Sequence, residues 1–148
     1  MKPWWQVAVP HKDIREERLE EAIFAANLGD VAQNKGPLDY RDPETFFKKT
    51  YFTAGLANLM GAILSKLSGK GKGNTVIQIQ TPFGGGKTHA LLALYHIFKH
   101  SDKVLHLDIV KKILKETCLK TIPKTKVVVF VGEYADPLKG KRILSLDI

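Results

Sequence analysis

The segment at residues 81–88, Thr-Pro-Phe-Gly-Gly-Gly-Lys-Thr, constrains this chain more than any other part of its sequence. Its last three residues match the end of the phosphate-loop template G-x-x-x-x-G-K-[ST], whereas Thr81 stands at the template's first glycine. Consecutive glycines allow backbone N–H groups to turn toward one anion, because no Cβ obstructs the backbone. The segment therefore predicts a phosphate-binding loop.

Each residue after the glycines suits a different part of a bound nucleotide. Lys87 can reach the β- and γ-phosphates, and the Thr88 hydroxyl is a typical ligand of the accompanying Mg²⁺. The expected cofactors are thus ATP and Mg²⁺, with Lys87 and Thr88 as catalytic candidates and Thr88 as the metal ligand. The residues expected to contact the cofactor are Gly84, Gly85, Gly86, Lys87, Thr88 and His89. For His89, packing or capping is the alternative role.

The sequence around the loop predicts a strand before it and a helix after it. Residues 75–80 are rich in β-branched side chains, whereas residues 88–99 are apolar and contain no helix breaker. Residues 108–119 predict a further helix, and residues 126–131 form a continuous apolar run of the kind buried inside parallel sheets. Together they would form a right-handed βαβ unit. The expected fold class is α/β, an incomplete parallel-sheet core of the P-loop NTPase type.

The N-terminal portion predicts helices instead of strands. Asp13 is placed to cap a first helix that stops at Gly29, and Asp42 followed by Pro43 is a typical start of a second, short helix. Thr53 is expected to cap a third helix, along which apolar residues recur at helical spacing. These apolar residues are Leu56, Leu59, Met60, Ile63, Leu64 and Leu67.

A stretch rich in glycine and lysine at residues 69–74 separates these two portions. The predicted organisation is a helical N-terminal segment over 1–68, a linker over 69–74 and the first βαβ unit of a P-loop NTPase domain over 75–148.

Charge is distributed unevenly along the 148 residues. The net charge is +8, yet residues 61–148 carry 15 Lys or Arg against 6 Asp or Glu, a net of +9. A basic portion of this kind makes nucleic acid a candidate partner. A solvated lysine-rich surface is the favoured alternative, because no aromatic side chains interleave with the lysines to stack on bases.

Several other classes of protein are excluded by pattern. No run approaches the ~18 apolar residues of a membrane-spanning helix, and the N-terminus lacks the apolar core of a secretory signal. The single cysteine, Cys118, excludes an internal disulfide framework. We therefore expect a cytoplasmic protein without a membrane partner, while no pattern indicates an oligomeric state.

Five stretches, at residues 3–14, 40–47, 50–53, 80–89 and 94–96, resemble the start of an archaeal and bacterial family of large AAA-type P-loop ATPases. That family is catalogued as a domain of unknown function, and some members lie in phage-defence gene clusters. The resemblance covers roughly residues 3–139, and its most specific block is 81–89, where threonine at position 81 is the usual form. It implies an AAA-like fold and ATP hydrolysis by the complete protein.

ATP hydrolysis requires an acidic residue that holds the Mg²⁺ shell. Position alone makes Glu133 and Asp147 two candidates for this acid, and Arg142 a candidate arginine finger. The resemblance implies instead that the acid follows residues 136–140 in longer family members, and residues 141–148 fit the family poorly. The chain is therefore interpreted as an N-terminal fragment from a truncated, frame-shifted or split gene, with the remaining ATPase portion on another chain.

Three classes of function stay open from the sequence. The first is an ATPase that is complete only with further sequence or a partner chain. The second is a nucleotide- or nucleic-acid-binding module without turnover. The third is a remnant that does not fold stably, because two parallel strands leave unpaired edges.

Overall fold

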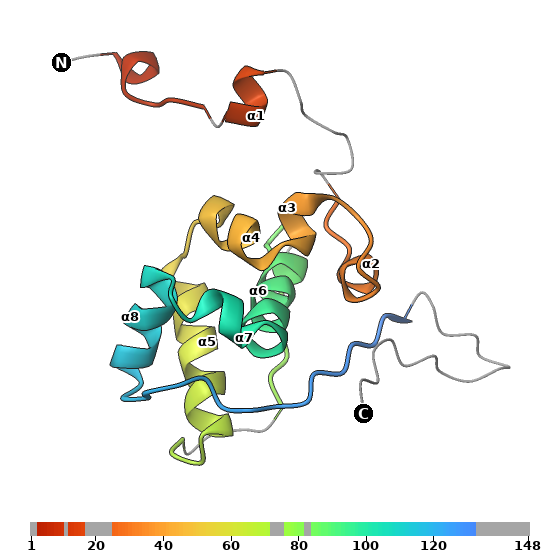
Figure 1. Ribbon diagram of the computed structural model, residues 1–148, viewed down its shortest axis with the longest axis vertical. Helices are drawn as coiled ribbons and strands as arrows, with labels where there is room; N and C mark the ends of the chain where they lie inside the picture. The colour runs from red at the N-terminus through yellow and green to blue at the C-terminus, as the bar shows by residue number, and fades with distance from the viewer. Residues whose placement is uncertain (1–2, 11, 17–24, 72–75, 82–83, 133–148) are drawn as a thin grey trace, which may run out of the picture.

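The chain forms a cluster of helices in the computed structural model, which describes residues 3–10, 12–16, 25–71, 76–81 and 84–132 (Figure 1). No β-sheet occurs in these ranges, where Val129 alone makes an isolated β-bridge. The helices are η1 (Trp4–Gln6), α1 (Lys12–Arg15), α2 (Leu28–Ala32), α3 (Leu38–Arg41), α4 (Pro43–Lys49), α5 (Ala54–Leu67), α6 (Lys87–Lys99), α7 (Ser101–Val104) and α8 (Asp108–Glu116).

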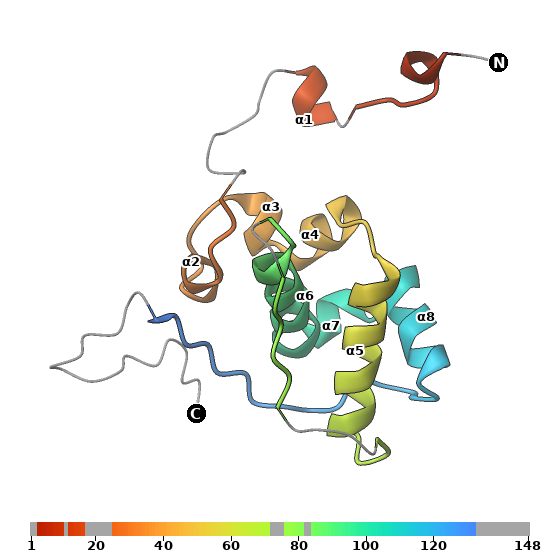
Figure 2. The same ribbon diagram turned by 180° about the vertical axis from the view of Figure 1, so that it is seen from behind.

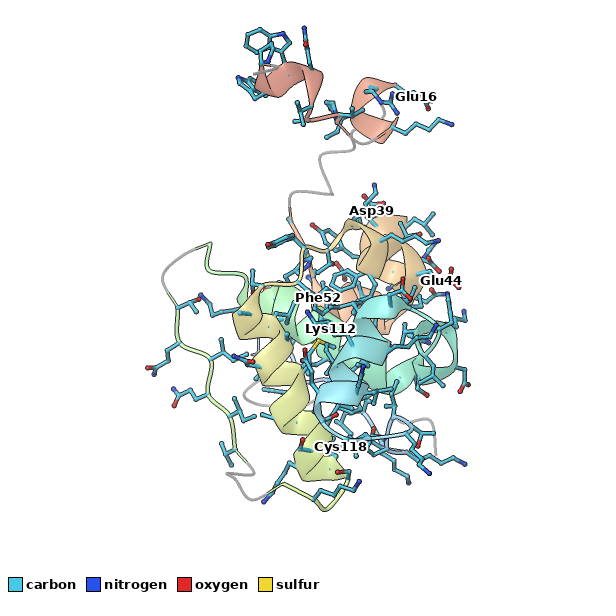
Figure 3. All side chains as sticks on the ribbon, turned by 90° about the vertical axis from the view of Figure 1, so that its left-hand side faces the viewer. Glu16, Asp39, Glu44, Phe52, Lys112 and Cys118 are labelled. Carbon is cyan, nitrogen blue, oxygen red and sulfur yellow. The ribbon has the colours of Figure 1, made fainter. Side chains whose placement is uncertain are left out.

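Helix α6 holds the cluster together. It packs against α2, α4 and α7, while α5 packs against α8. Seen from the front and from behind, the α5–α8 pair lies on one side of α6 and α2 on the other (Figures 1 and 2). Figure 3 shows Glu16 apart from this cluster, whereas Asp39 and Glu44 lie on the neighbouring helices α3 and α4. Two of the helices that pack on α6, α2 and α4, therefore precede the loop in the sequence.

One contiguous apolar core joins the helices before the loop with those after it. Its members come from α4 and α5 on one side and from α6, α7 and α8 on the other, so the two portions share a single interior. Its largest fully buried apolar side chains are Phe46, Met60, Leu64, Leu92, Ile97, Val104, Val110 and Ile113.

The predicted starts of α4 and α5 are confirmed by their capping hydrogen bonds. Asp42 Oδ2 accepts from the Thr45 backbone N–H at 2.8 Å, and Pro43 occupies the first turn of α4. Thr53 Oγ1 accepts from the Leu56 N–H at 3.2 Å at the start of α5. Each side chain satisfies a donor that has no acceptor within its own helix.

Removing the α5 cap gives a first testable result. Thr53→Ala should lower the free energy of unfolding by about 1 kcal/mol, because the Leu56 N–H loses its side-chain acceptor. Thr53→Ser retains the hydroxyl and should stay close to the wild type. Urea denaturation followed by circular dichroism measures both, and equal losses in the two variants would contradict a capping role.

The predicted first helix is wrong within the described residues. Helix α1 contains Asp13 instead of starting after it, and Gly29 lies inside α2 instead of ending a helix. Asn27 explains the second difference, since its Oδ1 accepts from Gly29 N at 2.8 Å and from Asp30 N at 3.3 Å, which starts a new helix there. The apolar positions Leu19, Ala22 and Ile23 lie outside the described residues.

The helices predicted after the loop are confirmed, with α8 shorter than expected. Helix α6 runs from Lys87 to Lys99, and α8 ends at Glu116 where residues 108–119 were predicted. The short helices α3 and α7 had no separate signal in the apolar pattern. Neither has a side-chain hydrogen bond at its N-cap.

The predicted α/β class, with a parallel-sheet core preceded by a helical segment, is wrong for the part of the chain that the structure describes. Residues 76–81 and 122–128 are extended but form no ladder. Val128, which was expected inside a sheet, is 58% exposed, and Val76 in the other predicted strand is 80% exposed. An extended segment becomes a strand only when a neighbour pairs with its backbone groups, and these two segments do not pair with each other. For the same reason, the described part of residues 75–148 contains no βαβ unit.

Within the described ranges, no helix is both long and apolar enough to cross a bilayer.

Candidate functional site

The backbone of the loop before α6 adopts conformations that glycine favours. Gly84 has φ +78° and Gly86 has φ +74°, both in the left-handed region. No atom lies within 4 Å of a Cβ built at either residue, so backbone conformation, not space, accounts for glycine here. Gly85 lies between them and is exposed, as they are. Pro82 and Phe83 lie outside the described residues.

Lys87 is the first residue of α6, and its ammonium group turns back over the loop. Its Nζ donates to the Thr81 carbonyl oxygen at 3.0 Å and contacts Thr81 Oγ1 at 3.1 Å. Thr81 is the residue at the first position of the template, so the lysine joins the two ends of the loop. Both oxygens are neutral, and neither contact cancels the charge that Lys87 carries to this place.

The N-terminus of α6 adds backbone donors beside that charge. The helix has 13 residues, and its N-cap, Gly86, makes no side-chain capping hydrogen bond. The first intrahelical bond runs from Ala90 N to the Gly86 carbonyl at 2.9 Å. The preceding N–H groups of the first turn therefore have no acceptor inside the helix, which is the arrangement that attracts an anion.

Thr88 is the second residue of α6 and is half-buried. Lys87 and Thr88, the lysine and the hydroxyl residue of the template, are thus the first two residues of α6. Among the described residues, no group of three His, Cys, Asp or Glu side chains is arranged to hold a metal ion. A hydroxyl at a phosphate loop does not need such a group, because Mg²⁺ takes most of its ligands from phosphates and water.

His89 anchors the first turn of α6 to α4. Its Nε2 lies 2.9 Å from Thr50 Oγ1, and Thr50 Oγ1 donates to the Phe46 carbonyl at 2.7 Å. Because the hydroxyl's one hydrogen lies on the second contact, His89 Nε2 must carry a proton and donate to Thr50. The imidazole ring also packs on Phe46, with the centroids 4.6 Å apart.

Burial lowers the pKa of His89 from its ordinary value of 6.5. The ring therefore stays neutral near pH 7, in the tautomer that donates to Thr50. The structure gives His89 a positioning role, since its hydrogen bond with Thr50, 39 residues earlier in the chain, ties α6 to the end of α4.

Sequence reasoning missed two residues of this site, Thr50 and Thr81. Thr81 was seen as a departure from the template, whereas its carbonyl and hydroxyl oxygens are the contacts of Lys87. Its place six residues before the lysine was the available signal. Thr50 had no local signal, because its contact with His89 forms only when α4 packs on α6.

The structure does not describe the other residues predicted to take part in ATP hydrolysis. Glu133, Asp147 and Arg142 all lie outside the described residues. The structure therefore brings together the loop glycines, Lys87, Thr88 and His89, and describes none of the proposed hydrolytic groups.

Comparison with known proteins identifies one match. A family model described as the DUF499 N-terminal domain matches residues 5–138, a range that contains the loop and every helix from α1 to α8. No curated protein and no solved structure matches the chain.

Proposed function

We propose that this chain, which belongs to the DUF499 N-terminal domain family, binds the phosphates of ATP together with Mg²⁺ through residues 84–88. The observation that carries the proposal is the position of Lys87. Its ammonium is held over the loop by Thr81, at the N-terminus of a helix whose first N–H groups have no acceptor inside the helix. A cation, backbone donors and a flexible turn are the parts that a phosphate site needs.

The roles within the site follow from these positions. The left-handed glycines 84 and 86 let the backbone curve around an anion, and Lys87 supplies the charge for the β- and γ-phosphates. Thr88 supplies one hydroxyl ligand for Mg²⁺, and the bound phosphates and water would supply the others. His89 keeps the first turn of α6 in place through Thr50.

Calorimetric titration with ATP and Mg²⁺ tests this proposal. Lys87→Ala should weaken binding about tenfold or more, because a charge-assisted hydrogen bond to phosphate contributes about 1.5–3 kcal/mol. Lys112→Ala is the matched control, since Lys112 is an exposed lysine on α8 and lies away from the loop in Figure 3. Unchanged affinity in Lys87→Ala, or equal losses in both variants, would reject the assignment.

Phosphate release from ATP, measured with and without DNA on the same preparation, separates the remaining alternatives. Binding with release supports the ATPase, whereas binding without release makes the chain a non-hydrolysing nucleotide-binding module. Stimulation by DNA would add a nucleic-acid partner to the proposal. A partner chain that restores hydrolysis would assign the remaining ATPase portion to that chain.

A further inference from the structure

A cavity lies at the opposite end of α6 from the loop. Its volume is about 430 Å³, and its walls come from α2, α3 and the segment that joins α6 to α7. Thirteen helical residues at ~1.5 Å each separate the two ends of α6 by about 20 Å. A ligand in this cavity would therefore not touch the loop residues 84–88.

The charge of the cavity is mostly positive. Arg41, Lys99 and Lys103 line it, together with His100. Burial lowers the pKa of His100, the nearby ammonium groups of Lys103 and Lys99 lower it further, and Asp42 opposes this shift. Three permanent cations in one small cavity favour an anionic occupant.

Among the described lining residues Asp42 is the one carboxylate; it offsets one of the three positive charges, and Lys103 contributes to the lowering of its carboxyl pKa, so a net positive charge remains. Asp42 Oδ2 accepts from the Thr45 N–H at 2.8 Å and from the Thr45 hydroxyl at 2.7 Å, so the oxygen is used to cap α4. The guanidinium of Arg41 is also fixed in place, because one of its N–H groups donates to the Asn34 carbonyl at 3.3 Å. The cation at this wall of the cavity is therefore positioned before a ligand arrives.

Apart from Asn34, the remaining lining residues are mainly apolar. Val31 and Tyr95 line the cavity and are 5% and 6% exposed. The Tyr95 ring meets the His100 ring edge-on, with centroids 5.8 Å apart, so aromatic and basic surfaces adjoin each other. Cavities that bind small molecules have volumes of about 300–1,000 Å³ and combine apolar walls with a few fixed polar groups.

We propose that this cavity binds a small organic phosphate of the size of a nucleoside monophosphate, with the phosphate near Arg41 and Lys103 and the flat apolar part against Tyr95. Arginine suits this task because its planar guanidinium can donate two parallel hydrogen bonds to one phosphate. The site is independent of the proposed ATP site, since it shares no lining residue with the loop.

A purely structural role for the cations explains less. Arg41, Lys99 and Lys103 each lie in the last turn of a helix, where basic side chains stabilise carbonyl groups. Helices α3 and α7 have only four residues each, so their dipoles are small. Capping would also not require the three side chains to surround one cavity.

Calorimetric titration with adenosine 5′-monophosphate, inorganic phosphate and adenosine tests the proposal. The wild type should bind the monophosphate more tightly than either fragment, because only the monophosphate meets both kinds of wall. Lys103→Gln and the double variant R41Q/K103Q should weaken that binding about tenfold or more, while Lys112→Gln should not change it.

Lys87→Ala locates the bound monophosphate. Retained affinity in this variant supports the cavity, whereas loss of affinity would place the ligand on the loop and overturn the proposal without touching ATP binding there. The proposal is also overturned if the folded wild type does not bind the monophosphate at millimolar concentration, or binds adenosine equally well. Thermal unfolding confirms that each variant is folded, and Lys103→Gln, at an exposed position, is decisive should R41Q/K103Q not fold.

Discussion

Replacing Phe46 with alanine is expected to lower the free energy of unfolding by about 3–5 kcal/mol. Phe46 is 1% exposed and lies where α4 packs on α6. Its ring centroid is 5.4 Å from that of Phe47, 4.6 Å from that of His89 and 5.2 Å from that of His96. Truncation leaves a cavity among three aromatic rings that cannot all move to fill it.

Urea denaturation followed by circular dichroism measures this loss. Tyr51→Ala is the matched control, because Tyr51 is an aromatic residue of the neighbouring segment that is 86% exposed, and its removal should change stability by less than about 0.5 kcal/mol. Failure of the Phe46→Ala protein to fold agrees with the prediction. A loss below about 1 kcal/mol would mean that α4 does not depend on α6 for its packing.

The helices that could be predicted from the sequence are those whose capping residues and apolar spacing lie within or beside the helix itself. Asp42 and Thr53 accept hydrogen bonds from residues three positions later, so both helix starts can be recognised without any tertiary contact. Met60 and Leu64 are spaced four apart and are both fully buried in α5. Gly29 misled the prediction because a glycine stop and a glycine inside a helix capped by Asn27 look alike in a short window.

The sheet could not be predicted correctly because a strand depends on partners that a local pattern does not contain. Residues 76–81 have the β-branched composition of a strand, but they form no β-ladder in the structure. Their pairing is a non-local property. Val128 was expected inside a sheet and is 58% exposed, and Val76 in the other predicted strand is 80% exposed, so composition did not predict the pairing.

The candidate site likewise combines residues that a local pattern predicts with contacts that depend on distant parts of the chain. Gly86 and Lys87 could be recognised from spacing, and the structure places them at the start of the helix that was predicted after the loop, with Gly86 in the left-handed region. The contacts of His89 with Thr50 and Phe46 join residues about forty positions apart. They follow from the packing of α4 on α6, for which the phosphate-loop template carries no information.

His96 is the buried ionisable group that most affects how stability depends on pH. It lies on α6, is 0% exposed, and its Nε2 donates to the Tyr40 carbonyl at 2.7 Å. Its Nδ1 is buried without a hydrogen-bond partner among the described residues. A proton added to Nδ1 would be a buried charge with no acceptor there, and the second tautomer would break the bond to Tyr40.

Burial lowers the pKa of His96 from 6.5 to about 4. The Tyr40 carbonyl opposes this shift, His100 adds to it, and Asp42 opposes it. Since the unfolded chain takes up its proton near pH 6.5 and the folded chain only near pH 4, folding should lose stability as the pH falls through that window. The direction is the same for His89 and His100, whose pKa values are also lowered by burial.

The loss attributable to His96 should reach about 3 kcal/mol at pH 4, from about 1.4 kcal/mol for each unit of pKa difference. Urea denaturation at half-unit steps from pH 7 to pH 4 measures it. His96→Gln keeps an N–H for the Tyr40 carbonyl but cannot take up a proton, so its stability should fall much less steeply over the same range, whatever its value at pH 7. The exposed His106 is the control, because His106→Gln leaves His96 in place and should retain the wild-type slope.

Protonation of Asp42 does not interfere with this measurement. Hydrogen bonding from the Thr45 backbone N–H lowers the pKa of its carboxyl below 3.8, so the stability that it contributes is lost only at lower pH. If the free energy of unfolding falls with equal slopes in His96→Gln and the wild type between pH 6.5 and pH 4, the imidazole of His96 must be protonated in the folded chain over that range. That outcome would require an acceptor for Nδ1 and would overturn the arrangement of α3 against α6 on which the hydrogen bond to Tyr40 depends.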